Sequence, residues 1–309
     1  MFKDSPLSDG GPGSNQHRAV GRFAPSPTGD LHFGSLLAAM ASYCDVKQQD
    51  GRWLLRIDDI DGPRSVSGSA DAIQHTLDIY GMEWDGPVQW QSQHIDRYQS
   101  SLDKLVKKNL IFACNCSRRS LPSGQIYPGS CRNNILTHNQ QSNDYCVPDH
   151  ALRIALTGQL NFQDKVQGSQ SVQLEEQVGD IIVWRRDKLV AYALACAIDD
   201  ALSVSHVVRG ADLLSNTSAQ IAIMRALKLP IPEYAHIPVA IDSNGDKLSK
   251  HSKARPISSQ AALPALVQAW NFLGQTKIDA ESIPDFWAQA IKLWQIERVP
   301  NAMRMCCEP

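Results

Sequence analysis

Hydrophobic and polar positions along the chain follow two periods, one typical of strands and one of helices. Compact apolar runs predict buried strands at Val20–Pro25, Arg52–Ile57 and His206–Arg209. Between these runs, apolar residues recur at helical spacing over Ser35–Lys47, Ser69–Tyr80, Ile95–Lys108 and Ser218–Leu227. Strands that alternate with helices favour a parallel sheet with crossover helices. The pattern therefore predicts an α/β fold.

The alternation is interrupted between Cys114 and about His150, where the chain is rich in Cys, Ser, Asn and Gly. Regular elements resume in three segments, which are Ala151–Ala155, Asp180–Trp184 and Val190–Ile198. We interpret the irregular stretch as an insertion between two halves of the α/β fold. Beyond Arg255, helical spacing over Ala261–Phe272 and Ile283–Gln295 predicts a short helical C-terminal part.

Composition and charge limit the class of protein. The chain has 309 residues, of which 43% are hydrophobic and 20% are charged, as in soluble globular proteins. It has no run of about 18 apolar residues that would span a membrane. The segment Met1–His17 lacks the apolar stretch of a signal peptide, so we expect a cytoplasmic protein, and we expect it to be a monomer.

A net charge of −2 gives no overall attraction for a polyanion, so a nucleic acid would need a local basic patch. Three sets of basic residues are candidates: Arg118, Arg119 and Arg132; Arg185 and Arg186; and Lys247, Lys250, Lys253 and Arg255. Each set is equally compatible with solvated surface charge.

Three of the eight cysteines have a spacing that suits a metal ion. The pair Cys114 and Cys116, followed by Cys131, is typical of part of a zinc site, and a cytosolic chain of this length disfavours a disulfide framework. A closed structural site takes four ligands, and four residues are open as the last one: Tyr127, Cys146, His138 and His150. The alternative is three reduced thiols at the surface. Cys306 and Cys307 are expected in a frayed tail.

Two segments far apart in the sequence are suited to holding a nucleoside triphosphate from two sides. Pro27–Ser35 predicts a glycine turn that leads into a helix with His32 at its N-terminus. A helix N-terminus presents N–H groups and a positive dipole to phosphate. The loop that begins at Lys247 carries a second lysine, Lys250, and lysines stabilise the charge that grows in a phosphoryl transition state. Neither segment is strong evidence without the other.

Polar residues that follow predicted strands are candidates for binding a substrate. Asp58, Asp59 and Asp61 come after a buried strand, at the edge where open α/β sheets bind ligands. A carboxylate there suits a substrate ammonium group, and the alternative is an aspartate that caps a turn. Arg209 ends another strand and suits two-pronged binding of a carboxylate, with a surface salt bridge as the alternative.

Five motifs, in this order, resemble those of the glutamyl-tRNA synthetase family over about residues 19 to 300. They are Arg22–Gly34, Arg56–Arg64, Ala191-Tyr192 with Asp199-Asp200, Val208–Asp212, and Lys247–Lys250. Full-length members of that family continue past the lysine loop with a helical anticodon-binding region, which we do not expect here. A catalytic core without that region, and with a Cys-x-Cys…Tyr-x-x-x-Cys insertion, is similar to the glutamyl-Q tRNA(Asp) synthetases.

The resemblance implies a Rossmann-type class I aminoacyl-tRNA synthetase core with a zinc-binding insertion and a short helical C-terminal part. It implies a flexible tail over residues 1–18 and a catalytic domain over 19–240, interrupted by the zinc-binding insertion over 111–150. The lysine loop and the helical C-terminal region would occupy residues 241–309.

The resemblance also implies a reaction. The protein would activate L-glutamate with ATP and Mg²⁺, without tRNA, and attach it to the queuosine base at the wobble position of tRNA(Asp). Residues implied to bind glutamate are Arg22, Phe23, Ala24, Pro25, Ser26, Asp58, Tyr192 and Arg209. ATP would be bound by His32, Gly34 and Lys250, and the catalytic residues would be His32, Lys247 and Lys250. One structural zinc ion would be bound by Cys114, Cys116, Tyr127 and Cys131.

Two positions depart from the family's pattern. Asp58 stands where the family usually has Glu, and the missing methylene shifts the pocket or admits a water. Gly62 stands where a second proline is common, which predicts a looser loop. The rival functions are a truncated glutamyl-tRNA synthetase that charges the 3′ end of tRNA(Glu), a non-catalytic nucleotide- or RNA-binding protein, and a small-molecule nucleotidyltransferase. The last would not explain the glutamate-pocket motifs.

Overall fold

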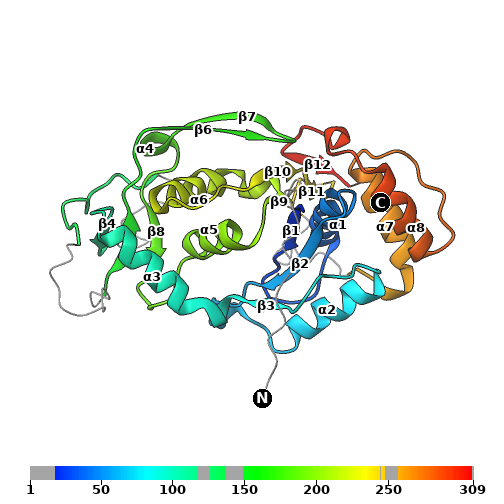
Figure 1. Cartoon of the computed structure of the whole chain (residues 1–309), viewed down its shortest axis with the longest axis horizontal. Helices are drawn as coiled ribbons and strands as arrows, with labels where there is room; N and C mark the ends of the chain where they lie inside the picture. Colours follow the sequence, from blue (N-terminus) through cyan, green and yellow to red (C-terminus); the bar gives the residue numbers. More distant parts are fainter. Residues whose placement is uncertain (1–17, 117–125, 137–148, 244, 248–256, 308–309) are drawn as a thin grey trace, which may run out of the picture.

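The computed structural model describes residues 18–116, 126–136, 149–243, 245–247 and 257–307. Parallel strands form its centre (Figure 1). Strands that pair in parallel are β1 (Val20–Phe23) with β2 (Arg52–Ile57), β2 with β3 (Gln89–Trp90), and β9 (His206–Gly210) with β10 (Glu233–Ile237). The N–H of Ser205 donates to the carbonyl of Val20 at 2.8 Å, which joins β9 to β1. The strands therefore lie in the Rossmann-type order β3-β2-β1-β9-β10.

Helices lie on both sides of these strands, as Figure 1 shows for α1 on one side of β1 and for α5 and α6 on the other. Their bounds are α1 (Phe33–Lys47), α2 (Ser69–Ile79), α3 (Ile95–Val106), α5 (Tyr192–Ser203) and α6 (Leu214–Leu227). Helix α1 packs closely on β1 at Gly21. A Cβ at that position would stand only 2.8 Å from Cγ1 of Val46 on the helix. This close approach requires glycine and brings the N-terminus of α1 to the end of β1.

The predicted α/β alternation is confirmed, and the strand Arg52–Ile57 has its predicted bounds. Helix α6 starts at Leu214 rather than at Ser218, because its first turn is polar in sequence and hides the helical spacing. Helix α5 continues to Ser203, through the pair Asp199-Asp200. Those two aspartates are buried inside the molecule, and their partners are described with the site below.

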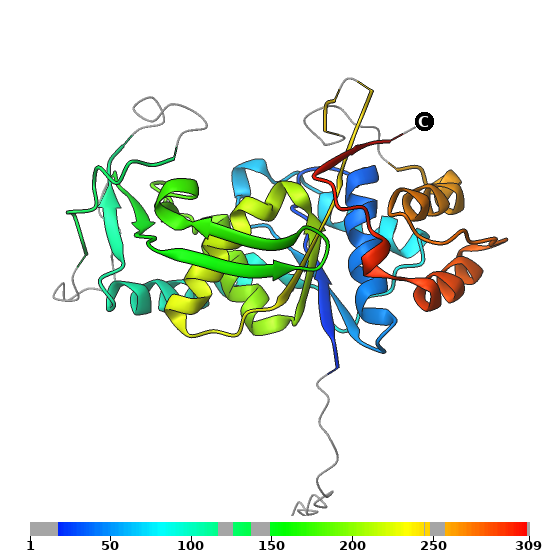
Figure 2. The same ribbon diagram turned by 90° about the horizontal axis from the view of Figure 1, so that it is seen from above.

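A hairpin that the sequence pattern did not predict lies beside the central strands. Its strands β6 (Gln159–Asp164) and β7 (Gly168–Gln173) are antiparallel, and β6 pairs with β10. The short helix α4 (Leu174–Gln177) follows. The hairpin's turn reaches the C-terminal segment, where Nε2 of Gln167 donates to the carbonyls of His236 and Ala302 at 2.8 and 3.1 Å (Figures 1 and 2). The hairpin is thus tied to the end of β10.

The segment interpreted as an insertion begins and ends in a second sheet, at the far end of the molecule from the C-terminal helices (Figure 1). Its antiparallel strands lie in the order β4 (Ile111–Cys114), β5 (Ala151–Ile154) and β8 (Ile181–Trp184). Apolar side chains from this sheet form one core with α3, α5 and α6, whereas a second core surrounds α1.

The C-terminal part contains two helices, α7 (Ala262–Phe272) and α8 (Ile283–Leu293), and both pack against the core around α1. Strand β11 (Val239–Ile241) pairs in parallel with β12 (Arg304–Cys306), so the expectation of a frayed tail at Cys306 was wrong. Single 3₁₀ turns are η1 (Gly62–Arg64), η2 (Gln91–His94), η3 (Ala211–Leu213), η5 (Ser259–Ala261) and η6 (Ile296–Arg298). No helix within the described residues has the length and apolar character needed to cross a membrane.

Candidate functional site

Two buried arginines share one buried aspartate where β1 and β2 meet α5. Arg22, on β1, donates from Nε and Nη2 to the two carboxylate oxygens of Asp200 at 3.0 and 3.2 Å. Arg56, on β2, donates from Nη1 to the same carboxylate at 2.7 Å. Burial raises the pKa of Asp200, but the two guanidinium groups outweigh burial and hold the pKa well below its usual range. Asp200 therefore stays ionised and fixes both arginines.

Asp58, the candidate for binding the substrate ammonium, also pairs with Arg56. Its carboxylate accepts from Nε of Arg56 at 2.7 Å. Burial raises the pKa of Asp58, while Arg56 opposes this effect. A cavity of about 70 Å³ lies against this carboxylate, and Ser26 and Tyr192 line it as well. Three of the predicted glutamate-binding residues therefore surround one small cavity.

Asp199 joins this cluster to the start of α3. It accepts hydrogen bonds from Nε2 of Gln91 at 2.8 Å and from the hydroxyl of Tyr98 at 2.6 Å. Arg56 approaches the same carboxylate at 4.0 Å. The ionic network of Arg22, Arg56, Asp58, Asp199 and Asp200 therefore links three elements, and we call it the arginine–aspartate network.

Arg209, at the end of β9, lies beside this network but is not paired with a carboxylate. Arg209 is buried, with only 4% of its surface exposed. Nε donates to Nε2 of His236 at 3.1 Å, and Nη2 donates to Thr217 Oγ1 and Gln220 Oε1, each at 2.7 Å. Within the part of the chain that the structure describes, its buried Nη1 has no hydrogen-bond partner. Arg22 instead uses its Nη1 on the carbonyl of Val208, at 3.3 Å.

The loop that follows β1 brings the remaining predicted glutamate residues to the same edge. The carbonyl of Pro25 accepts the N–H of Asp58 at 3.0 Å, which fixes Ala24–Ser26 beside the acidic loop. Phe23 directs its ring into the core, where it stacks on Trp53 with centroids 6.2 Å apart. Tyr192 begins α5 and lines the same cavity, and burial raises the pKa of its hydroxyl.

The predicted phosphate-binding turn has a defined geometry at the N-terminus of α1. His32 is the N-cap residue, and its Nδ1 accepts the N–H of Ser35 at 3.2 Å. Gly34 lies in the first turn of the helix. Gly29 has a φ of 131°, which favours glycine, and its N–H and carbonyl both bond to the hydroxyl of Ser69 on α2. The turn is thus held between α1 and α2.

The lysine loop is only partly described. Lys247 forms an ion pair with Asp212, with Nζ 2.6 Å from Oδ2. This pair joins the loop to the end of β9, two residues after Gly210. Lys250 and His251 lie outside the described residues. The structure therefore brings Lys247 to the end of the strand that carries Arg209. The predicted role of Lys250 stays a prediction.

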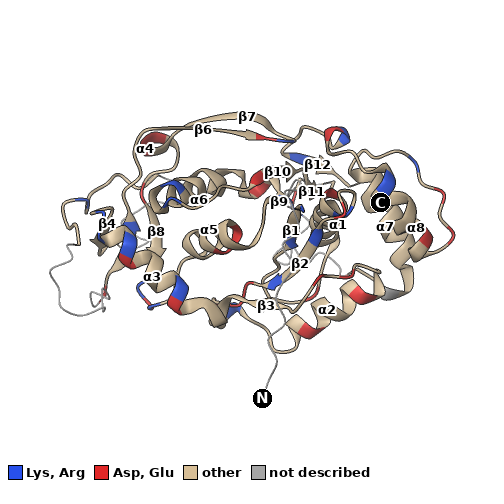
Figure 3. Ribbon diagram, in the orientation of Figure 1, with Lys and Arg blue, Asp and Glu red and all other residues tan. Residues whose placement is uncertain are grey.

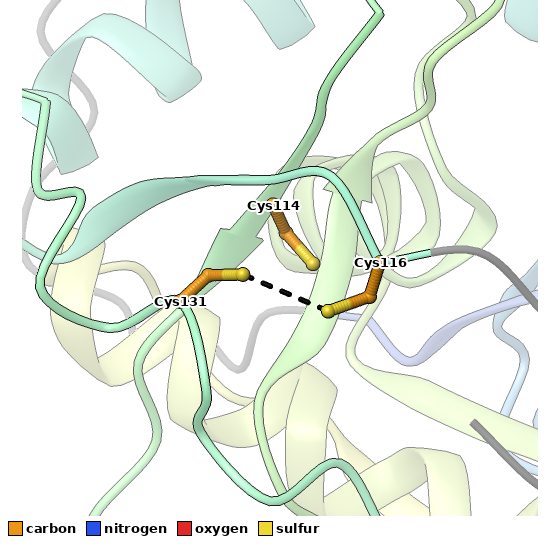
Figure 4. A group of neighbouring side chains, drawn as sticks. All are labelled: Cys114, Cys116 and Cys131. Carbon is orange, nitrogen blue, oxygen red and sulfur yellow. Dashed lines mark hydrogen bonds between the residues drawn. The ribbon is translucent and has the colours of Figure 1, made fainter. Parts of the chain in front are cut away.

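Three sulfur atoms come together between β4 and the loop that follows it (Figure 4). The Sγ atoms of Cys114, Cys116 and Cys131 all lie within 4.8 Å of one another. The hydroxyl of Tyr127 lies 3.6 Å from Sγ of Cys114 and accepts the N–H of Cys131 at 2.9 Å. The cluster is close enough to bind one metal ion. Of the other candidate ligands, His138 and Cys146 lie outside the described residues.

A buried arginine lies against this cysteine cluster. The guanidinium carbon of Arg153 is 4.0 Å from the centroid of the Tyr127 ring. Burial raises the pKa of the Cys114 thiol, but hydrogen bonds from Tyr127 and Arg153 outweigh this effect and lower it to about 7. The surroundings therefore favour the thiolate, which is the form that binds metals.

Among the candidate basic residues that the structure describes, three are in ion pairs with aspartates, and Arg186 donates to backbone carbonyls. Arg132 donates to both oxygens of Asp180, at 2.6 and 2.8 Å. Arg185 pairs with Asp61 at 2.9 Å. Arg118, Arg119, Lys253 and Arg255 lie outside the described residues. Figure 3 shows acidic and basic residues interspersed on the described elements.

Several residues that organise the site were not selected from the sequence. Arg56 and His236 each interrupt an apolar strand, and a buried polar residue of this kind needs a partner. That signal was present in the sequence. The partner itself was not, because Arg56 and Asp200 lie 144 positions apart.

The fold and this site define the catalytic domain of a class I aminoacyl-tRNA synthetase. Residues 19–278 match the protein family described as tRNA synthetases class I (E and Q), catalytic domain. A solved glutamate tRNA ligase from Elizabethkingia meningosepticum has the same fold, with a TM-score of 0.75 and 23% identity, and the match covers 94% of this chain and 67% of that one.

Two relatives refine the class. Proteins named glutamyl-Q tRNA(Asp) synthetase are 40% identical over 296 residues in Aromatoleum aromaticum and 44% identical over 286 residues in Pseudomonas putida. The matches cover 92% of this chain in both cases, and 91% and 92% of the relatives. The chain belongs to the glutamyl-Q tRNA(Asp) synthetase family.

Proposed function

We propose that this protein activates L-glutamate with ATP and transfers the glutamyl group to queuosine at the wobble position of tRNA(Asp). The observation that carries the proposal is the match to glutamyl-Q tRNA(Asp) synthetases across 92% of the chain, at 40% identity or more in the relatives described above. The cavity beside Asp58, Ser26 and Tyr192 supports it, because a small polar substrate needs such a site.

The glutamate site is proposed to use two groups of opposite charge, Nη1 of Arg209 and the carboxylate of Asp58, which also accepts from Arg56 at 2.7 Å. Arg209 offers a buried Nη1, which suits a substrate carboxylate. Asp58 offers a carboxylate at the cavity wall, which suits the ammonium group. Arg22 uses its Nε, Nη1 and Nη2 atoms on Asp200 and the Val208 carbonyl, so we assign it mainly to shaping the pocket. The segment Ala24–Ser26, which is bonded to the acidic loop through the Pro25 carbonyl, is proposed to line the site, whereas the Phe23 ring lies in the core.

ATP is proposed to lie between the N-terminus of α1 and the lysine loop. His32 and Gly34 stand at the positive end of the helix dipole, which favours phosphate. Asp212 anchors the loop through Lys247, and Lys250 supplies positive charge three residues further along. Mg²⁺ accompanies ATP as part of the substrate. In this proposal the helix N-terminus holds the phosphates from one side, and Lys250, which lies outside the described residues, holds them from the other.

The chemistry follows from this placement. A glutamate carboxylate oxygen attacks the α-phosphorus of ATP, the bond to the bridging oxygen breaks, and pyrophosphate leaves with that electron pair. A queuosine hydroxyl then attacks the carbonyl carbon of the glutamyl-adenylate, loses its proton and releases AMP. No side chain forms a covalent intermediate, so positioning and charge stabilisation supply the catalysis.

The cysteine cluster is proposed to bind one structural Zn²⁺ through Cys114, Cys116, Cys131 and Tyr127. Tetrahedral thiolates at about 2.3 Å from zinc stand about 3.8 Å from each other. The Sγ atoms of Cys116 and Cys131 are 3.6 Å apart, which agrees with that spacing. Zinc there would fix the chain between β4 and β5.

The proposal also includes the domain organisation, in which residues 111–150 form the zinc-binding insertion and residues 241–309 form the C-terminal part. The cytoplasmic location and the monomeric state stay predictions.

Glutamate-dependent exchange of pyrophosphate into ATP, without tRNA, tests the activation step. We expect exchange with L-glutamate and little with L-glutamine or L-aspartate, because Arg209 is proposed to bind the substrate carboxylate and Asp58 its ammonium group. Absence of exchange with all three amino acids would favour a non-catalytic binding protein instead.

A further inference from the structure

Arg209 is held by a chain of buried polar groups that starts on the β6–β7 hairpin. Oδ2 of Asp164, at the end of β6, is 2.5 Å from Nδ1 of His236. His236 lies on β10, and its Nε2 receives the Nε–H of Arg209 at 3.1 Å. The side chains of Asp164 and His236 are both fully buried. The chain therefore runs from the hairpin to the proposed carboxylate-binding group.

Hydrogen-bond polarity fixes the protonation state of His236. A guanidinium only donates, so Nε2 of His236 must be the acceptor and carries no proton. Nδ1 then carries the proton and donates it to Asp164. Which ring nitrogen is protonated is set by the hydrogen bond that the other nitrogen makes. Asp164 therefore selects the only neutral tautomer that can accept from Arg209.

Asp164 is itself held rigidly by the hairpin turn. Its Oδ1 accepts the backbone N–H groups of Gln167 at 2.8 Å, Val166 at 3.0 Å and His236 at 3.1 Å. The carboxylate thus accepts four hydrogen bonds, three on Oδ1 and one on Oδ2, and all four come from the turn and from β10. A core that needed only packing would use apolar groups here, since burying charge is unfavourable unless it is paired.

We propose that Asp164 and His236 are positioning residues for the amino-acid substrate: Asp164 fixes the tautomer of His236, and His236 directs Nη1 of Arg209 toward the substrate carboxylate. This inference rests on the proposed glutamate activation. Thr217 and Gln220 hold Nη2 from α6 at 2.7 Å each, so the guanidinium is fixed on two edges, and Nη1 is the nitrogen that has no partner among the described residues. Rigid support of this kind determines how well a binding group is oriented.

Three variants test the proposal through the Michaelis constants for glutamate and for ATP in pyrophosphate exchange. His236→Leu removes the acceptor, and we expect the KM for glutamate to rise about tenfold or more with the KM for ATP within about twofold. His236→Gln places an amide oxygen near Nε2, so it should recover most of the affinity. Asp164→Asn allows the other tautomer, which points an N–H at Arg209, and should weaken glutamate binding as His236→Leu does.

His206→Gln is the matched control. His206 is a histidine at the first position of β9, the strand beside β10, and its ring pairs with Glu233 at 3.2 Å rather than with Arg209. It should leave both constants unchanged. An unchanged KM for glutamate in folded Asp164→Asn and His236→Leu would overturn the proposal. If His236→Leu does not fold, the comparison of His236→Gln with Asp164→Asn decides: equal constants overturn the proposal, and weaker binding in Asp164→Asn supports it. Absence of exchange in the unmodified protein would instead overturn the proposed function.

Discussion

The arginine–aspartate network and the cysteine cluster both gather groups that ionise, but the two regions are completed in opposite ways. In the network, Asp200 is neutralised within the chain by Arg22 and Arg56. In the cluster, three sulfurs that repel one another as thiolates lie within 4.8 Å. Asp200 therefore has its opposite charges within the chain, whereas thiolates in the cluster would take theirs from a bound cation. The comparison shows that the buried carboxylate of Asp200 is paired within the chain, whereas the three sulfurs are grouped as ligands of a metal ion would be.

The difference also predicts how each region fails. Removing one member of the network leaves a buried charge without a partner, which is among the largest single-residue effects on stability. Removing one thiol takes away one ligand of the proposed zinc site, and the remaining sulfurs can bind protons in place of the metal ion. Its effect should appear in metal binding and in local stability instead.

The largest expected effect is from Asp200→Ala, which leaves Arg22 and Arg56 buried without their shared carboxylate. We expect the free energy of unfolding to fall by about 3–5 kcal/mol. Urea unfolding followed by circular dichroism measures it. The matched control is Asp187→Ala, which removes the exposed partner of Arg185 and should change stability by about 1 kcal/mol or less. Equal losses in the two variants would contradict the account of the network.

A smaller effect is expected from Cys116→Ser in the cluster. The metal content, measured by plasma mass spectrometry, should fall from about one zinc per chain to near zero, since a closed site needs its four ligands. The thermal midpoint should fall, while pyrophosphate exchange stays near its normal rate because the arginine–aspartate network remains intact. Cys44→Ser is the control, since Cys44 is a buried core thiol on α1 outside the cluster. Full zinc occupancy in Cys116→Ser would refute the assignment.

The smallest effect is expected in how the stability that Asp200 contributes depends on pH. The pKa of Asp200 in the folded protein lies below its ordinary value, which is about 3.9 in an unfolded chain. Between those two values the unfolded state binds more protons, so this carboxylate stabilises the fold above about pH 4 and loses that effect as the pH falls. The stability difference between the wild type and Asp200→Asn should therefore shrink below about pH 4. A difference that stays constant from pH 6 to pH 3 would be inconsistent with a lowered pKa.

The sequence was informative where chemistry and periodicity coincide. The alternation of strands and helices predicted the α/β order, and the polar residues at strand ends placed Asp58 and Arg209 in one region. The cysteine spacing predicted the sulfur cluster, because a Cys-x-Cys pair followed by a third cysteine is typical of a zinc site. Recognised motifs added the family, which the comparisons then showed.

What the sequence did not predict depends on contacts between distant residues. The hairpin β6–β7 is rich in Gln and Ser, and its few apolar residues, Leu160 and Phe162 on β6 and Val172 on β7, are too sparse for the strand period to stand out. Asp164 is the buried residue at its end, and its role depends on His236, which is 72 positions away. Strand β12 was missed for the same reason, since its pairing with β11 is fixed by tertiary structure rather than by its own three residues.

Transfer of labelled glutamate to purified tRNA tests the central claim most directly. Three acceptors are compared with the same protein and ATP: tRNA(Asp) that contains queuosine, tRNA(Asp) that lacks it, and tRNA(Glu). The account predicts label only on queuosine-containing tRNA(Asp). Label on tRNA(Glu), or equal label on both forms of tRNA(Asp), would contradict it and would identify a different acceptor for the activated glutamate.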